Sequence, residues 1–294
     1  MKKFFAFALL VAIAVVGVSQ WPWIQNHLLG HSVAGSAASS TVAPQSSALA
    51  LSAPVAPRTI LFAIDPTTST ASGFAGSLRS DVIADVTGYV PPLPMKAQQE
   101  AGVAAIPGLH LTVNLVSSTP AKTGEPSWSV SIPAVDGLPP QPSISASALK
   151  IGGALDQWSS LQATWLKQYQ TALATAAAAA QTLTGIDLSN PTNSSITGAL
   201  EELTQMAQSD PSATYVIGSD LLDNQATQSG SSLAGAPIDV IQACPSGSLQ
   251  TCDATFSSFA AWAKANHAGT ITRVDPADGA AMLAALIDPT QKGK

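Results

Sequence analysis

Three short stretches of this chain carry carboxylate and hydroxyl side chains close together. They are Asp65-Pro66-Thr67-Thr68-Ser69, Thr192-Asn193-Ser194-Ser195 and Ser219-Asp220. A hard divalent cation such as Mg²⁺ takes six oxygen ligands and usually keeps several waters among them. Two carboxylates and several hydroxyls would suit such an ion, so the three stretches predict a cation site, provided that the fold brings them together.

Each stretch adjoins a predicted element of secondary structure. Thr59–Ile64 is a continuous apolar run, typical of a strand buried on both faces, and Asp65 follows it directly. Thr214–Ile217 is a second such strand and leads into Ser219-Asp220. The middle stretch precedes a predicted helix with Ile196, Leu200, Leu203 and Met206 on one face.

The remaining elements alternate in the same way. Further strands are predicted at Leu109–Val116, Trp128–Ile132, Ile238–Ile241 and Thr270–Val274. Further helices are predicted from Phe74 to Val86, where apolar residues recur at helical spacing, and over Ala146–Leu183. Another is predicted to be capped by Asp253, to run through His267 and to be closed by Gly269, and a last one to begin after Asp275-Pro276. Strands separated by helices predict an α/β fold, namely a doubly wound, mostly parallel sheet with helices on both faces. In such sheets, ligands bind beyond the carboxyl ends of the strands.

The residues at these strand ends resemble a known motif. Asp65-x-Thr67-x-Ser69 is similar to the Asp-x-Ser-x-Ser motif of the von Willebrand factor type A (vWA) domain, with one serine replaced by threonine. Asp220 matches the third-loop aspartate of that family. The segment SSITGAL, residues 194–200, looks like the family's Thr-x-Ile-x-x-Ala-Leu, which puts Ser194 at the threonine position, with Thr192 as a near alternative.

The resemblance implies a vWA-like domain over residues 59–290 that binds a protein or peptide partner and catalyses no reaction. It implies a divalent cation, Mg²⁺ or else Mn²⁺ or Ca²⁺, with an open position for a carboxylate of the partner. The implied metal ligands are Asp65, Thr67, Ser69, Ser194 and Asp220.

The same residues also fit a fold without a metal. Asp-Pro commonly opens turns, and serine or threonine before a helix is ordinary N-capping. Ser194 in place of threonine favours this alternative, a degenerate vWA-like scaffold that serves as a structural part of an envelope complex.

The sequence lacks residues that two candidate classes of enzyme require. A haloacid-dehalogenase-type phosphatase would need an acid where Thr67 stands. A serine hydrolase would need a Gly-x-Ser-x-Gly elbow, which the sequence does not contain. His27 and His31 are predicted to lie near a membrane, His110 falls in a predicted strand, and His267 lies near a helix end.

The N-terminal part predicts a location outside the cytoplasm. Lys2 and Lys3 precede the apolar run Phe4–Val18, and Trp21 and Trp23 follow it. Residues 1–29 are therefore predicted to be a membrane anchor, which is favoured over a cleaved signal peptide that would leave the protein secreted. Residues 30–58, rich in serine, alanine and proline, are predicted to be a flexible linker.

The cysteine pair and the low charge of the chain bear on its location and its partners. Cys244 and Cys252 are eight residues apart and predict a disulfide, since extracytoplasmic proteins keep such bonds. Charged residues make up 10% of the chain and the net charge is −6, without a basic stripe, so no nucleic-acid partner is expected.

Overall fold

The structure is a computed structural model, and it describes residues 49–53, 55–67, 73–116, 128–143, 148–188, 196–207, 212–222, 232–244 and 249–288. These residues belong to one compact unit, Ala48–Lys294. The predicted anchor and most of the predicted linker lie outside the described residues. Within the described part, no helix combines the length and the apolar character needed to cross a bilayer.

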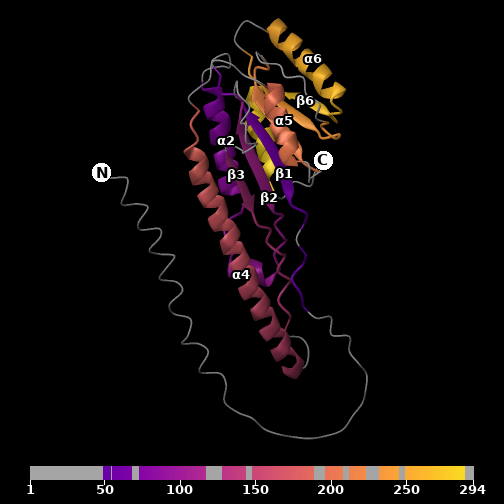
Figure 1. The fold of residues 1–294 in the computed structure, drawn as a ribbon. Coiled ribbons are helices and arrows are strands. Elements are labelled where there is room, and N and C mark those ends of the chain that lie inside the picture. The colour runs from indigo at the N-terminus through magenta and orange to yellow at the C-terminus, as the bar shows by residue number, and fades with distance from the viewer. Residues whose placement is uncertain are drawn as a thin grey trace, which may run out of the picture. The chain divides into compact units, whose positions relative to one another are not determined.

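A single six-stranded sheet organises this unit, in the order β3-β2-β1-β4-β5-β6 (Figure 1). Its strands are β1 (Arg58–Ile64), β2 (Leu109–Leu115), β3 (Trp128–Ile132), β4 (Thr214–Ser219), β5 (Ile238–Gln242) and β6 (Ile271–Val274). All neighbouring pairs are parallel except β2 and β3. The predicted doubly wound, mostly parallel sheet is confirmed.

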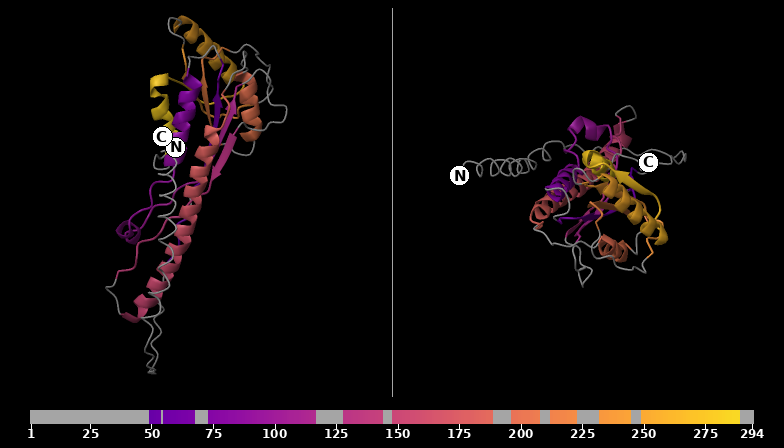
Figure 2. Two further views of the ribbon diagram at one scale, coloured as in Figure 1. Left: turned by 90° about the vertical axis from the view of Figure 1, so that its left-hand side faces the viewer. Right: turned by 90° about the horizontal axis from the view of Figure 1, so that it is seen from above.

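Helices cover both faces of the sheet, as Figure 2 shows. They are α2 (Phe74–Gly88), α3 (Lys96–Glu100), α4 (Ala148–Thr184), α5 (Ile196–Ala207), α6 (Leu249–Ala265) and α7 (Pro276–Ile287). Alternate residues of β1 point to opposite faces: Phe62 packs with α2, α4 and α7, whereas Leu61 packs with α5 and α6. Because β1 is buried on both sides from Ile60 to Ile64, its sequence there is continuously apolar rather than alternating.

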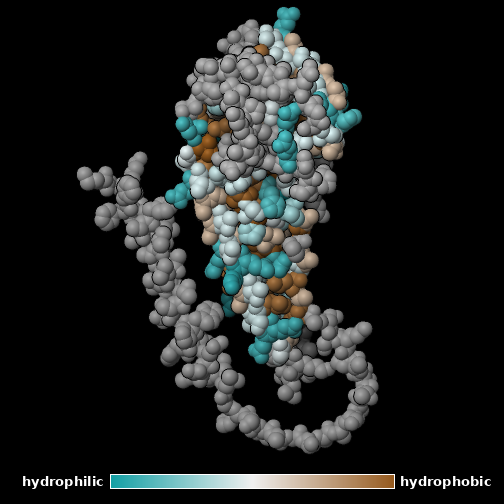
Figure 3. Space-filling model, in the orientation of Figure 1, coloured by the Kyte–Doolittle hydropathy of each residue, from teal (hydrophilic) through white to brown (hydrophobic). Residues whose placement is uncertain are grey.

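The long helix α4 is attached through an aromatic stripe. It has 37 residues, about 55 Å at the usual helical rise. This stripe consists of Trp158, Trp165 and Tyr169, all of which are buried in the core. The Trp158 Nε1–H donates to the Pro139 carbonyl at 2.9 Å, and the Tyr169 hydroxyl donates to the Pro91 carbonyl. On the face drawn in Figure 3, hydrophilic and hydrophobic residues are interspersed along the described part.

The sheet continues as a narrow ribbon beyond the amino ends of β1 and β2. Isolated antiparallel bridges join Ser52 to Gly137, Val103 to Leu138, and Ile106 to Val135. Ser52, which the sequence placed in the linker, is part of this ribbon. The chain therefore enters β1 at the end opposite to Asp65.

The helix termini are partly as expected. The Asp275 side chain accepts a hydrogen bond from the Ala277 amide, and Pro276 opens α7, as predicted. The prediction for α6 was wrong at both ends. The helix begins at Leu249, so that Asp253 lies within it, and it ends at Ala265, followed by the left-handed residue His267 (φ 62°) rather than by a closing Gly269. Cys252 is buried and bonded to Cys244, which fixes this part of the helix against the end of β5.

Candidate ligand site at the carboxyl ends of the central strands

The strand order reverses between β1 and β4. From β1 the chain builds outward first through β2 and β3, and then on the other side through β4, β5 and β6. Such a switch point leaves a crevice at the carboxyl ends of the two central strands, where doubly wound sheets bind their ligands. Asp65 follows β1, and Ser219-Asp220 ends β4, so both predicted carboxylates lie at this position.

Backbone hydrogen bonds fix the register of the strand ends. Ile64 pairs with Gly218, and the Asp65 amide donates to the Gly218 carbonyl at 2.8 Å. On the far side of β4, the Ala243 amide donates to the Ser219 carbonyl at 3.0 Å. Asp65 and Ser219 are therefore positioned by the hydrogen-bonded ends of the strands.

Asp65 is held by two hydrogen bonds. The Ser219 hydroxyl donates to its Oδ2 at 2.7 Å, and the Thr67 amide donates to its Oδ1 at 3.0 Å. Asp65 and Ser219 are both fully buried, and Thr67 is 3% exposed. Buried polar groups persist when they are hydrogen-bonded, and these contacts also fix the direction of the carboxylate.

The chain turns sharply after β4 around similar contacts. The Leu221 amide donates to the Ser219 hydroxyl, and the Leu222 amide donates to Asp220 Oδ1, each at 2.9 Å. Leu221 has a φ of 61°, in the left-handed region that side chains other than glycine rarely adopt. Strained residues of this kind cluster at ligand sites, where the surroundings hold them in place.

Glycine at position 218 allows α2 to approach this edge. A Cβ atom built on Gly218 would lie 2.2 Å from Leu78 Cδ1, and real atoms do not approach so closely. Leu78 is a buried residue of α2, the helix that follows the Asp65 stretch. The absence of a side chain at Gly218 thus sets the depth at which α2 packs beside the site.

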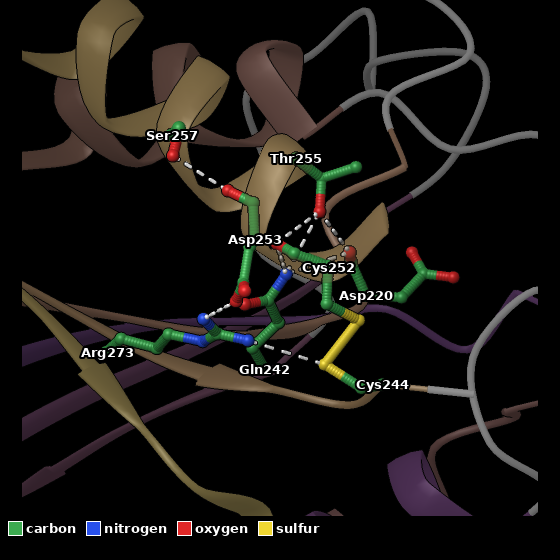
Figure 4. Close-up of polar contacts among 8 residues, drawn as sticks. All are labelled: Asp220, Gln242, Cys244, Cys252, Asp253, Thr255, Ser257 and Arg273. Carbon is green, nitrogen blue, oxygen red and sulfur yellow. Dashed lines mark hydrogen bonds and ion pairs between the residues drawn. A yellow bond between two sulfur atoms is a disulfide. The ribbon is translucent and has the colours of Figure 1, made fainter. Parts of the chain in front are cut away.

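Gln242 extends the polar cluster to β5, as Figure 4 shows. Its Nε2 donates to the Cys252 carbonyl at 2.9 Å and to Thr255 Oγ1 at 3.0 Å, and it lies 3.4 Å from the Asp220 carbonyl. Thr255 Oγ1 also lies 3.4 Å from that carbonyl. The backbone of Asp220 is therefore linked to the first turns of α6.

Buried polar side chains are concentrated at this edge. Eight are found in the described part of the chain, and two of them, Gln99 and Thr204, lie elsewhere. The other six lie at or near the carboxyl ends of β1, β2, β4 and β5: Asp65, Thr67, Asn114, Ser219, Asp220 and Gln242. Such clustering is expected where a sheet edge serves a ligand, and it is unusual for a purely apolar core.

The predicted ligand set is therefore brought together in part. Asp65, Thr67 and Asp220 meet at one edge, whereas Ser69, Ser194 and Thr192 lie outside the described residues. Asn114 and Gln242 were missed, although each is a polar residue near the carboxyl end of a predicted strand, and this position is readable from the sequence. Within the described residues, no three His, Cys, Asp or Glu side chains gather to hold a metal, so any cation here would depend on hydroxyl and amide oxygens as well.

The predicted disulfide between Cys244 and Cys252 is present, with Cα atoms 5.9 Å apart. It joins the end of β5 to the first turn of α6, next to Gln242. His110 and His267 are both exposed on the surface and belong to other parts of the fold. Comparison of the chain with protein-family models, with curated proteins and with solved structures returns no match.

Proposed function

We propose that this chain is a vWA-like, extracytoplasmic binding domain that engages a protein or peptide partner through a divalent cation at the carboxyl ends of β1 and β4. The observation that carries the proposal is the pairing of Asp65 with Ser219 at the switch point of the sheet. Around this pair lie most of the buried polar side chains of the described residues. This concentration of buried oxygen and amide groups at the switch point is what supports a ligand site there.

The donor set fits a hard cation. Carboxylate and hydroxyl oxygens are the ligands that Mg²⁺ prefers, and Asp65, Thr67 and Asp220 supply them from two adjacent strand ends. Ser69 and Ser194 complete the proposed set. A bound cation would offer an open coordination position to an acidic side chain of the partner.

A binding role is favoured over catalysis. Neither described histidine belongs to this edge, and both are exposed. Asp65 accepts hydrogen bonds at both oxygens, so the direction of its carboxylate is fixed.

The direction of the chain suits a tethered domain. Leu49–Pro57 reaches β1 at its amino end, opposite to the Asp65 edge. The proposed binding edge follows the carboxyl end of β1, at the other end of the strand from this entry.

Thermal melting with added cation tests the proposal. We expect millimolar Mg²⁺ or Mn²⁺ to raise the melting temperature, because a ligand that binds only the folded state stabilises it by mass action, by about 2.7 kcal/mol at one hundred times Kd. The rise should disappear in Asp65→Ala and in Asp220→Asn and persist in Asp156→Ala, an exposed control on α4. No rise in the parent protein at 10 mM of either metal would contradict the cation site.

Site-specific cross-linking tests the partner. A photoreactive residue at Leu222, beside the edge, should capture a partner in intact cells, and chelation of divalent cations should abolish the product. The same group at Met95, which is 72% exposed and next to α3, should capture none in a cation-dependent manner. Equal, chelator-insensitive capture at both positions would contradict a cation-dependent interface.

One observation favours a metal-free scaffold as the second candidate. Asp65 has hydrogen-bond donors at both carboxylate oxygens without any metal, so the buried group is satisfied within the protein. In a scaffold, Asp65 and Ser219 would only clamp β1 to β4. Asp65→Ala would then lower stability equally with and without Mg²⁺, whereas a cation site predicts a larger loss in its presence.

A further inference from the structure

The Cys244–Cys252 disulfide is unevenly exposed. Cys252 is 2% exposed in the first turns of α6, whereas Cys244 is half-buried at the end of β5. Cys244 lines a pocket of about 520 Å³ together with Leu249, Arg273 and Pro276. Leu249, at the mouth of this pocket, is 71% exposed, although it is apolar. Cys244 is therefore the more exposed residue of the pair and faces a pocket, whereas Cys252 is shielded.

Arg273 places a positive charge beside the accessible sulfur. Its Nη2 lies 3.6 Å from Cys244 Sγ, while its Nη1 donates to Asp253 Oδ1 at 2.6 Å, as Figure 4 shows. The guanidinium also lies 5.5 Å from the centroid of the Phe256 ring. These contacts hold it over the disulfide, where a cation attracts and stabilises an attacking thiolate.

We propose that Cys244–Cys252 is a thiol-exchange site at which an external dithiol attacks Cys244, and that its reduction loosens the Asp220 end of β4. The reductant is a dithiol protein or small molecule whose thiolate enters the pocket beside Arg273. Leu249 offers an apolar contact to the chain that carries this thiol.

The proposed thiol–disulfide exchange takes place in two steps. The incoming thiolate forms a bond to Cys244 Sγ, the disulfide breaks, and Cys252 leaves with the electron pair and takes up a proton. The second thiol of the dithiol then loses its proton and displaces Cys244, which is protonated in turn. Two electrons and two protons pass to the protein, and the dithiol becomes a disulfide. The leaving Cys252 is the fourth residue of α6, where the helix N-terminus stabilises a thiolate.

The link to Asp220 runs through the side chain of Gln242. Gln242 Nε2 donates to the carbonyl of Cys252 and also lies near the carbonyl of Asp220. Thr255, one turn further along α6, contacts the same two carbonyls. Reduction frees Cys252 from β5, so the first turn of α6 can shift and weaken both contacts. A consequence for cation binding rests on the proposed function, whereas the exchange chemistry does not.

The position of attack can be measured on the full chain without denaturant. Incubation with 2-mercaptoethanol, followed by acid quenching and peptide mass spectrometry, should place the mixed disulfide on Cys244. An adduct on Cys252, or a bond that resists 10 mM dithiothreitol in the folded protein, would overturn the proposal. Arg273→Gln should slow reduction about fivefold, and Lys264→Gln, a control at the other end of α6, should not. Equal rates in the two variants would remove the role of Arg273.

The coupling can be read by amide hydrogen exchange, without added metal. Reduction should speed exchange at Leu221 and Leu222 at least tenfold and leave Ile60–Phe62 of β1 unchanged. Unchanged exchange at Leu221 and Leu222, or a uniform rise over the whole domain, would contradict the coupling. Because no cation is present, these outcomes are separate from the Mg²⁺ melting experiment, and either proposal can fail alone.

Discussion

The Ser219 hydroxyl donates a 2.7 Å hydrogen bond to Asp65 Oδ2 and so joins the ends of two central strands whose residues are 154 positions apart in sequence. Both side chains are fully buried. The same hydroxyl accepts a hydrogen bond from the Leu221 amide. Ser219 therefore fixes the direction of the Asp65 carboxylate and the turn that carries Asp220.

Replacement of Ser219 by alanine should lower the free energy of unfolding by about 1–3 kcal/mol, because it leaves a buried carboxylate and a buried amide short of a partner. Urea denaturation measures the loss. Ser80→Ala, which removes an exposed hydroxyl bonded to the Gly76 carbonyl, should stay within about 0.5 kcal/mol of the parent. In an Asp65→Ala background, Ser219→Ala should cost clearly less, and full additivity would contradict the coupling.

Gly218→Ala should destabilise the fold by about 1–3 kcal/mol, because the new methyl group would overlap Leu78 and force α2 away from the sheet. Gly76→Ala is the matched control in α2, since a Cβ there meets nothing within 4 Å. That change should stabilise the helix by about 0.5–1 kcal/mol. Thermal melting of the two variants should therefore shift in opposite directions.

Two buried tryptophans of α4 allow the contribution of a hydrogen bond to stability to be measured apart from that of packing. Both are buried, but the Trp158 Nε1–H donates to the Pro139 carbonyl, whereas the Trp165 Nε1–H has no hydrogen-bond partner among the described residues. Replacement by phenylalanine removes the same atoms at each site. Trp158→Phe should cost about 1 kcal/mol more than Trp165→Phe, since only the first loses a hydrogen bond. Equal losses in chemical denaturation would show that the contact to Pro139 contributes nothing.

The raised pKa of Asp85 predicts that the stability of the fold depends on pH. Burial raises the pKa of this carboxyl to about 6, and the neighbouring Asp81 adds to the increase. The folded state thus binds a proton more tightly than the unfolded state, and stability falls as the pH rises from about 4 to about 6.

Asp85→Asn should remove this dependence. Allowing for the solvent that reaches this half-buried group, the variant should be about 1 kcal/mol more stable than the parent at pH 7. The two proteins should be equal near pH 3. Denaturation at several pH values measures the difference, and Asp278→Asn on α7 is a control from another helix. A variant less stable than the parent at pH 7 would contradict the assigned cause.

The central strands and the polar residues that follow them were predictable because burial on both faces leaves a simple pattern. β1 and β4 are continuous apolar runs, and a carboxylate ends each run. The Asp275-Pro276 start of α7 was equally clear, since a capping side chain and a fixed φ act locally. Such features depend on a few neighbouring residues.

The missed features depend on distant partners. The helix α6 begins at Leu249, three residues before the disulfide-bonded Cys252, so Asp253 lies inside the helix and is not its cap. The ribbon that pairs Ser52 with Gly137 unites segments far apart in sequence and has little apolar periodicity. The side-chain contacts of Gln242 with α6 likewise follow from tertiary packing, not from the β5 sequence.

The entry of the chain at the amino end of β1 has a mechanical consequence. A pull between Leu49 and a partner held at the Asp65 edge would run along the length of β1. Hydrogen bonds to β2 on one side and β4 on the other lie across that line, so they would be loaded together in shear instead of opening one after another. The strand that carries the proposed contact is thus also the one best placed in the sheet to bear tension.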